Sequence, residues 1–146
     1  MPKIDFYILP DADANARLLF ACRLIEKLYK QKHTIYIHTE NQTMAHELDE
    51  MLWTWRDDSF LPHNLYGEGP NPAPPIQIGF DAIPEKHRDI LINLHTDIPT
   101  FHSQFARVIE LIRNETTAQE SGRERYRDYR AQQLTINTHK LQTIEI

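Results

Sequence analysis

IDFYILPDADANARLLFACRLIEKLYKQKHTIYIH, residues 4–38, is the stretch that decides the fold class. Its first residues, 4–9, are β-branched and aromatic, which predicts a buried strand that stops at Pro10. Residues 14–30 repeat apolar side chains at helical spacing, and residues 34–38 again have the composition of a strand. A strand, a helix and a second strand in succession predict parallel strands joined by a crossover helix.

The alternation of strands and helices continues beyond this stretch. Thr39 or Asn41 can cap a helix, because a short side-chain oxygen accepts a hydrogen bond from an unpaired amide. The buried face of that helix is expected to carry Ala45, Leu48 and Leu52. Further strands are expected at residues 61–65, 76–80 and 89–94.

The last third of the chain predicts two more helices and an extended end. Pro99 opens the first, whose apolar side chains recur at helical spacing at Phe101, Phe105, Val108, Ile109 and Ile112. The second helix spans residues 118–132, and residues 134–144 alternate like an edge strand or an extended tail. Residues 1–146 are therefore expected to form a single three-layer Rossmann-like α/β domain, with a mostly parallel central sheet and helices on both faces. The last few residues are expected to be disordered.

Composition restricts the class of protein. The 146 residues carry a formal net charge of −5, which argues against direct binding of nucleic acid, where Lys and Arg supply most of the affinity. Cys22, the single cysteine, is expected to be an inert thiol in the core. There is no secretory signal at the N-terminus and no apolar run near the roughly 20 residues of a membrane span, which predicts a cytoplasmic protein without a membrane partner.

Motifs for cofactor chemistry are missing from the sequence. Its four glycines form neither GxGxxG nor a P-loop, and its eight histidines lack metal-ligand spacing, so no cofactor and no metal are expected. His63 is interpreted as a residue that orders its loop through hydrogen bonds. We expect a noncatalytic protein. The alternatives are a nucleotide-dependent hydrolase or transferase on a Rossmann-like sheet and a protein that binds single-stranded DNA directly.

The helix at residues 118–132 offers one candidate binding surface. Arg123, Tyr126, Arg127 and Arg130 lie at positions i, i+3, i+4 and i+7, so one helix face combines guanidinium groups with an aromatic ring. Such a face suits a peptide rich in carboxylates. It is equally typical of a solvated helix face on which the arginines pair with neighbouring acids.

Residues 48–70, LDEMLWTWRDDSFLPHNLYGEGP, contain a second candidate surface. Trp53, Trp55 and Phe60 follow one another closely among charged residues. Large aromatic side chains in a polar loop pack into a satellite core or form the centre of an interface. The residues alone leave both possibilities open.

Three segments resemble one known family. LDEMLW at residues 48–53, SFLPHNLYGEGP at residues 59–70 and RERYRDYR at residues 123–130 are similar to the signature of the chi subunit of bacterial DNA polymerase III holoenzyme. The resemblance extends from FYIL, which begins at Phe6, to Asn137 and Thr138. It implies a noncatalytic accessory protein of the clamp loader in DNA replication.

The resemblance also implies two partners. Trp53 and Phe60 match the positions that bind the psi subunit of the clamp loader, whereas the role of Trp55 stays open. The acidic C-terminal tail of single-stranded DNA-binding protein, which ends in an apolar residue with a free carboxylate, is expected to bind Ile112, Arg123, Tyr126, Arg127 and Arg130. Many relatives carry a lysine where this chain has Gln119, so tail binding is expected to be weaker here.

Overall fold

The computed structural model describes residues 2–56, 60–69, 72–85 and 89–142. The predicted disorder at the C-terminal end lies outside these residues, as do parts of the aromatic stretch at 57–59 and 70. The elements, in chain order, are β1 Lys3–Ile8, α1 Ala14–Lys30, β2 Ile35–His38, α2 Gln42–Thr54, β3 His63–Leu65, β4 Ile76–Gly79, β5 Ile90–Asn93, the short 3₁₀ helix His102–Gln104, β6 Arg107–Ile112, α3 Thr116–Ala131 and β7 Thr135–Lys140.

Side-chain caps start the helices where the sequence supplies short polar residues or an acid. Asp13 precedes α1 and accepts a hydrogen bond from the Asn15 amide at 3.0 Å. Asn41 caps α2 and accepts from the Met44 amide at 2.9 Å, which selects Asn41 over Thr39 as the cap. Both predicted helices are confirmed.

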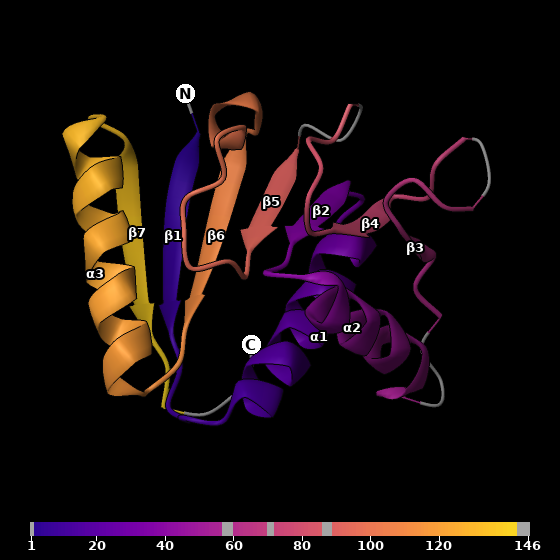
Figure 1. The fold of residues 1–146 in the computed structure, drawn as a ribbon, viewed down its shortest axis with the longest axis horizontal. Coiled ribbons are helices and arrows are strands. Elements are labelled where there is room, and N and C mark those ends of the chain that lie inside the picture. Colours follow the sequence, from indigo (N-terminus) through magenta and orange to yellow (C-terminus); the bar gives the residue numbers. More distant parts are fainter. Residues whose placement is uncertain (1, 57–59, 70–71, 86–88, 143–146) are drawn as a thin grey trace.

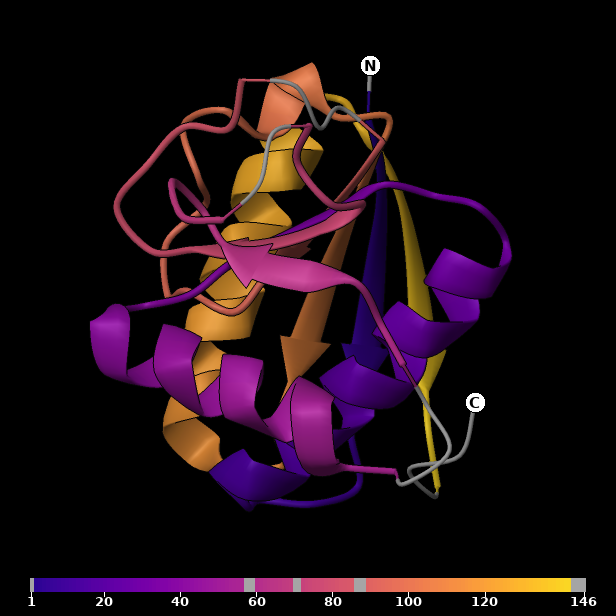
Figure 2. The same ribbon diagram turned by 90° about the vertical axis from the view of Figure 1, so that its right-hand side faces the viewer.

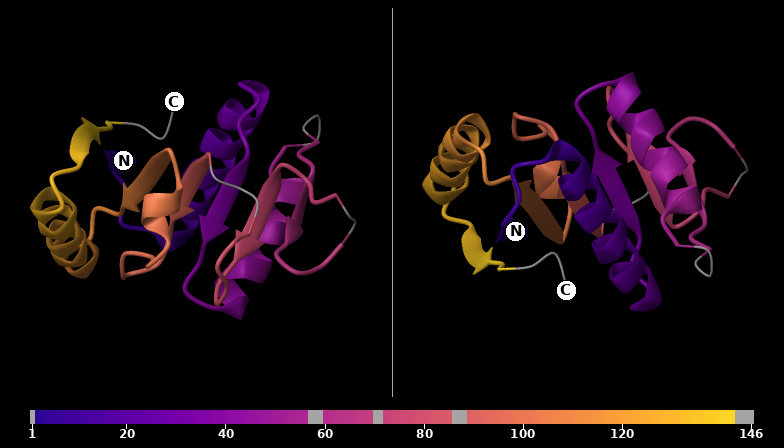
Figure 3. Two further views of the ribbon diagram at one scale, coloured as in Figure 1. Left: turned by 90° about the horizontal axis from the view of Figure 1, so that it is seen from above. Right: turned by 90° about the horizontal axis from the view of Figure 1, so that it is seen from below.

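The seven strands found among the described residues form one parallel sheet in the order β3-β4-β2-β5-β6-β1-β7 (Figure 1). The predicted α/β class with helices on both faces is confirmed, because α1 and α2 cover one side of the twisted sheet and α3 covers the other (Figures 2 and 3). The predicted edge strand near the C-terminus is β7, which pairs with β1.

A buried core lies on each face of the sheet. On the α1 and α2 side, strand residues such as Ile37 and Ile92 pack against helix residues such as Ile25 and Leu48. Cys22 belongs to this core, and burial raises the pKa of its thiol to about 12, so the predicted inert thiol is confirmed. The core on the α3 side contains several aromatic rings: Phe6, Tyr36, Phe101, Phe105 and Tyr129.

The helix predicted after Pro99 is wrong. Residues 107–112 form β6, and only His102–Gln104 coil, as a 3₁₀ turn. Val108 and Ile109 are neighbours in sequence and both fully buried, because β6 lies between β5 and β1 with a covered face on each side. In such a strand, a continuous apolar run also satisfies helical spacing, so spacing alone could not distinguish the two structures.

Candidate functional site

An N-terminal cap and a face turned toward the sheet define the position of helix α3. Glu115 caps it, and its carboxylate accepts hydrogen bonds from the amides of Thr117 and Ala118, both at 2.9 Å. These backbone hydrogen bonds hold the pKa of Glu115 below its ordinary value. The helix turns Gly122, Arg125 and Tyr129 toward the sheet and leaves the arginines between them exposed.

Between α3 and the sheet lies a cavity of about 300 Å³, which we call the α3 cavity. Its strand side is apolar, with Phe6 and Ile8 from β1 and Ile112 from β6. The other lining residues are Gln119, Gly122, Arg123, Tyr126 and Thr138. The cavity therefore lies over three strands that the chain reaches at widely separated points of the sequence.

The chemistry of the α3 cavity is apolar inside and cationic at the edge. The rings of Tyr126 and Phe6 pack with their centroids 5.5 Å apart, and Tyr126 is half-buried. Arg123 lines the same cavity and is exposed to solvent. A site of this kind can bury an apolar side chain while a guanidinium group pairs with a nearby carboxylate.

Gly122 brings α3 close to β6. A Cβ atom added at this position would lie 2.9 Å from Cδ1 of Ile112. An isolated glycine within a helix costs about 1 kcal/mol relative to alanine, so its presence indicates a packing or functional reason. A glycine inside a predicted helix is therefore a sequence signal that could have drawn attention to this position.

The structure brings together three of the five residues predicted for the tail site. Ile112, Arg123 and Tyr126 line the α3 cavity, whereas Arg127 and Arg130 are exposed on α3 and do not line it. Sequence reasoning missed the lining residues from the strands: Phe6, Ile8 and Thr138. Alternation along residues 4–8 predicts which side chains share a face, but not that α3 covers that face.

Gln119, where the resemblance led us to expect a lysine in relatives, is a neutral residue on α3. It lines the α3 cavity, and its side-chain amide donates a hydrogen bond to Asn114 Oδ1 at 3.1 Å. A neutral amide therefore forms this part of the lining.

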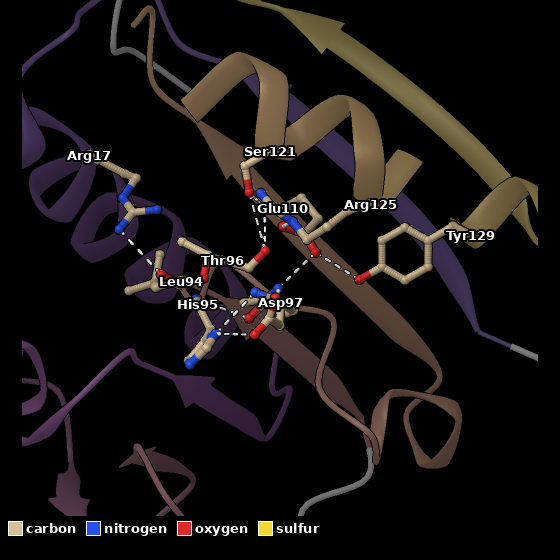
Figure 4. A network of polar contacts seen from close by, with 10 residues as sticks. Arg17, Leu94, His95, Thr96, Asp97, Glu110, Ser121, Arg125 and Tyr129 are labelled. Atoms are coloured by element: carbon tan, nitrogen blue, oxygen red, sulfur yellow. Dashed lines mark hydrogen bonds and ion pairs between the residues drawn. The ribbon is translucent and has the colours of Figure 1, made fainter. Parts of the chain in front are cut away.

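A buried polar network beneath α3 sets the position of the helix (Figure 4). Glu110 of β6 is fully buried and accepts hydrogen bonds from Arg125 Nε at 3.0 Å, the Tyr129 hydroxyl at 2.7 Å and Asn93 Nδ2 at 2.9 Å. Burial raises the pKa of Glu110, against the opposing effects of Arg125 and the other hydrogen-bond donors. The same desolvation, followed by the nearby Glu110 charge, raises the pKa of Tyr129.

Arg125 extends this network to the loop after β5. Its Nη1 donates to the Thr96 carbonyl at 2.8 Å and to the Ser121 hydroxyl at 2.7 Å (Figure 4). Arg125 is therefore a buried structural residue, unlike Arg123 and Arg127 on the same helix.

The second candidate surface lies at the end of α2. Trp53 is 49% exposed and Phe60 is 69% exposed, and their ring centroids are 5.8 Å apart. We call this pair the aromatic surface. Exposed apolar side chains that lie next to each other mark interaction sites more often than isolated ones do.

His63 supports the aromatic surface from below. Its ring is buried, 4.2 Å from the Trp53 ring between centroids. Nδ1 donates to the Leu61 carbonyl at 2.6 Å, and Nε2 lies 3.2 Å from the Asp49 carboxylate. The prediction that His63 orders its loop through hydrogen bonds is confirmed.

Trp55 differs from Trp53, although only one residue separates them. It is partly buried and packs against the core on the α1 and α2 side. The guanidinium carbon of Arg56 lies 5.5 Å from the centre of its ring. Trp55 therefore belongs to the satellite core, whereas Trp53 and Phe60 face solvent.

The two surfaces lie at opposite ends of the sheet. The α3 cavity is lined from β6, β1 and β7, and the aromatic surface adjoins β3 through the contact of Trp53 with His63. These strands lie at opposite ends of the sheet (Figure 1). In the part of the chain that the structure describes, no group of three or more His, Cys, Asp or Glu side chains could hold a metal ion. No described helix is long and apolar enough to cross a membrane.

Comparison with known proteins gives one consistent result. A family model described as DNA polymerase III chi subunit, HolC, matches residues 1–137. DNA polymerase III subunit chi of Pseudomonas aeruginosa is 39% identical over 144 residues, which cover 99% of this chain and 100% of that protein. The subunit of Escherichia coli is 35% identical, with 94% of this chain and 97% of that protein covered. The subunit of Haemophilus influenzae is 31% identical, with coverages of 93% and 95%.

A solved structure adds a likeness of fold alone. The crystal structure of T4 UvsW superimposes with a TM-score of 0.69 at 11% sequence identity. The match covers 98% of this chain and 42% of that one.

Proposed function

The chain belongs to the DNA polymerase III chi subunit family, and we propose that it acts in DNA replication as a noncatalytic adaptor with two protein-binding surfaces. An accessory role in DNA replication, with protein partners in the holoenzyme, follows from the family. The proposed partners are the acidic C-terminal tail of single-stranded DNA-binding protein at the α3 cavity and the psi subunit of the clamp loader at the aromatic surface.

One observation carries the proposal for the tail. Ile112, Tyr126 and Arg123 meet in one cavity of about 300 Å³, which has an apolar interior and an exposed guanidinium group. A peptide that ends in an apolar residue presents a side chain and a terminal carboxylate a few atoms apart. The cavity offers a matching partner for each.

Arg127 and Arg130 have a different proposed role. Both are exposed on α3 outside the cavity. We propose that they attract the acidic residues that precede the apolar end of the tail. Exposed charges of this kind mainly raise the association rate, and their effect weakens with added salt.

No observation favours the alternative hypothesis of a nucleotide-dependent hydrolase or transferase. Phosphates bind at the N-terminus of the helix after the first strand in such folds, where backbone amides are free. In this chain the carboxylate of Asp13 accepts a hydrogen bond from the Asn15 amide at the N-terminus of α1. A phosphate at this position would meet like charge.

The test is a titration of a fluorescent peptide that copies the tail of the cognate single-stranded DNA-binding protein into the full chain. We expect weak, exchangeable binding, with a dissociation constant no tighter than tens of micromolar, because one charge-assisted hydrogen bond and one buried side chain each contribute about 1.5–3 kcal/mol. Arg123→Ala and Tyr126→Ala should each lower the affinity by about tenfold or more.

Two controls separate the pocket from general attraction by charge. Lys27→Ala removes an exposed cation from α1, away from the α3 cavity, and should leave the affinity unchanged. A peptide with an amidated end should bind the unmodified chain more weakly, because it lacks the terminal carboxylate. Equal binding of both peptides, or full binding by the folded Arg123→Ala variant, would refute the tail site.

A further inference from the structure

Two exposed apolar side chains belong to neither surface of the proposed function. Phe80 is 38% exposed and Ile83 is 57% exposed, and both follow the end of β4. They line a cavity of about 420 Å³, which we call the acidic groove. Its other lining residues are His38, Asp81, Ala82, His95, Asp97, Ile98, Pro99, Thr100 and Phe101.

The acidic groove lies at the carboxyl ends of β2, β4 and β5, which are neighbours in the sheet. Open parallel sheets bind their ligands at this edge, because the loops that follow the strands converge there. One wall is residues 80–83, directly after β4, and the other is the loop between β5 and the 3₁₀ helix. His38, at the end of β2, stacks on His95 of the second wall, with ring centroids 5.3 Å apart.

Hydrogen bonds fix the wall that carries Phe80 and Ile83. The amide and the hydroxyl of Thr39 both donate to the Gly79 carbonyl, at 2.8 and 3.0 Å. The Tyr36 hydroxyl donates to the Ala82 carbonyl at 3.2 Å. The two exposed apolar side chains therefore project from a backbone that the sheet holds in place.

The opposite wall is held in the same way. Asn93 Nδ2 donates to the Asp97 carbonyl at 3.2 Å, and the Asn93 Oδ1 accepts from the His95 amide at 3.0 Å. His102 Nδ1 donates to the Pro99 carbonyl at 2.9 Å. Ordered walls reduce the entropy that a ligand must remove on binding, so the groove is prepared for a partner.

Among the residues that the structure describes, Asp81 and Asp97 give the lining of the acidic groove a negative charge. Asp81 and Asp97 are exposed at its edge, and no lysine or arginine occurs among the described residues that line it. Burial, followed by the nearby His95, lowers the pKa of His38 to about 4, so this histidine is neutral at pH 7. The groove is therefore opposite in charge to the α3 cavity, which has Arg123 at its edge.

We propose that the acidic groove binds a peptide segment of a partner protein in which an aliphatic or aromatic side chain is flanked by lysine or arginine. Ile83 and Phe80 bury the apolar side chain, and Asp81 and Asp97 pair with the flanking cations. A nucleic acid does not fit this chemistry, because its phosphates would meet carboxylates. The proposal uses neither surface of the proposed adaptor function and does not depend on it.

A random heptapeptide library displayed on phage, panned against the full chain and depleted on an Ile83→Asp variant, tests the proposal. We expect the enriched peptides to place a lysine or arginine beside an aliphatic or aromatic residue. Synthetic copies should bind Ile83→Asp at least about tenfold more weakly. The double variant Asp81→Asn/Asp97→Asn should lose about fivefold, because each exposed ion pair contributes modestly.

Lys27→Asp is the matched control, since it also introduces an aspartate at an exposed position, on α1 and outside the acidic groove. It should bind the enriched peptides as tightly as the unmodified chain. The far-ultraviolet circular dichroism of each variant must match that of the unmodified chain. Three results would overturn the proposal: no peptide that depends on Ile83, enrichment of acidic peptides, or unchanged affinity in the double asparagine variant.

Discussion

At the scale of single residues, Gly122 allows α3 to approach β6 closely beside the α3 cavity. It is buried, and an added Cβ atom would approach Ile112 Cδ1 to 2.9 Å. Alanine favours the helix by about 1 kcal/mol over glycine, so the helix itself would gain from the substitution. The loss would appear in the cavity, because the Ile112 side chain that lines it would have to shift.

We predict that Gly122→Ala weakens binding of the tail peptide several-fold without lowering the free energy of unfolding. Ile112→Val removes the Cδ1 atom that the new methyl group would meet, so the double variant should regain most of the affinity. Peptide titration and urea unfolding of the three variants measure both quantities. A double variant that binds no better than Gly122→Ala would show that the contact with Ile112 is not the cause.

Arg125 and Arg127 provide a second test at this scale, because they are one residue type on one helix. Arg125 is buried against the carboxylate of Glu110, and Arg127 is exposed. Arg125→Met should lower the free energy of unfolding by about 3 kcal/mol or more, because it leaves a buried carboxylate without its cation. Arg127→Met should change it by no more than about 0.5 kcal/mol. Urea unfolding compares them, and similar losses for both would contradict the structural role of the buried pair.

Helical spacing predicted some residues of the site and could not predict others. Arg123 and Tyr126 share a helix face, so their proximity is visible in the sequence. The burial of Arg125 is not visible, because its partner Glu110 lies on a strand that the same spacing predicted as a helix. Phe6 and Thr138 enter the cavity only because β1 lies beside both β6 and β7, which is a property of the sheet order.

At the scale of elements, one carboxylate joins three adjacent strands. Asp5 of β1 accepts from Arg107 Nε of β6 at 2.6 Å and from His139 Nε2 of β7 at 3.0 Å. Burial acts to raise the pKa of Asp5, but the hydrogen bonds from His139 and Arg107 outweigh it and hold the pKa below its ordinary value. The ion pairs therefore support the parallel register of β6, β1 and β7.

This arrangement predicts a specific dependence of stability on pH. Because the folded state lowers the pKa of Asp5, its contribution is complete above the unfolded value of about 3.9 and disappears as the pH falls through the folded value. We expect the difference in free energy of unfolding between the unmodified chain and Asp5→Asn to shrink below about pH 4. Urea unfolding across this range measures it. A difference that persists unchanged down to about pH 2.5 would contradict the lowered pKa.

Most elements could be predicted because their signals are local. The cap Asn41, the β-branched and aromatic composition of residues 4–9 and the amphipathic helix at 14–30 each depend on neighbours in sequence. Local signals did not identify strand β6, because its apolar run results from burial of both of its faces by elements distant in sequence. The order of the strands lies beyond local signals for the same reason, although the alternation of elements correctly indicated a parallel sheet.

At the scale of the whole molecule, the sheet separates the two proposed adaptor surfaces. The α3 cavity is lined from β6, β1 and β7, and the aromatic surface adjoins β3. Figure 1 shows these strands at opposite ends of the sheet. Sites that share no residues contribute to binding nearly independently. An adaptor gains from this arrangement because one partner can exchange while the other stays bound.

We therefore predict that the two surfaces can be inactivated separately. Trp53→Ala and Phe60→Ala should each cost about 2 kcal/mol or more of affinity for the psi subunit, because exposed aromatic side chains act as anchors when a partner buries them. Both variants should bind the tail peptide normally, and Arg123→Ala should show the reverse pattern. Calorimetric titration with each partner, alone and with the other at saturation, measures the four affinities. The two surfaces would be coupled through the sheet if Trp53→Ala weakened binding of the tail peptide, or if a saturating psi subunit changed the affinity for that peptide. Either result would contradict the prediction of independent surfaces.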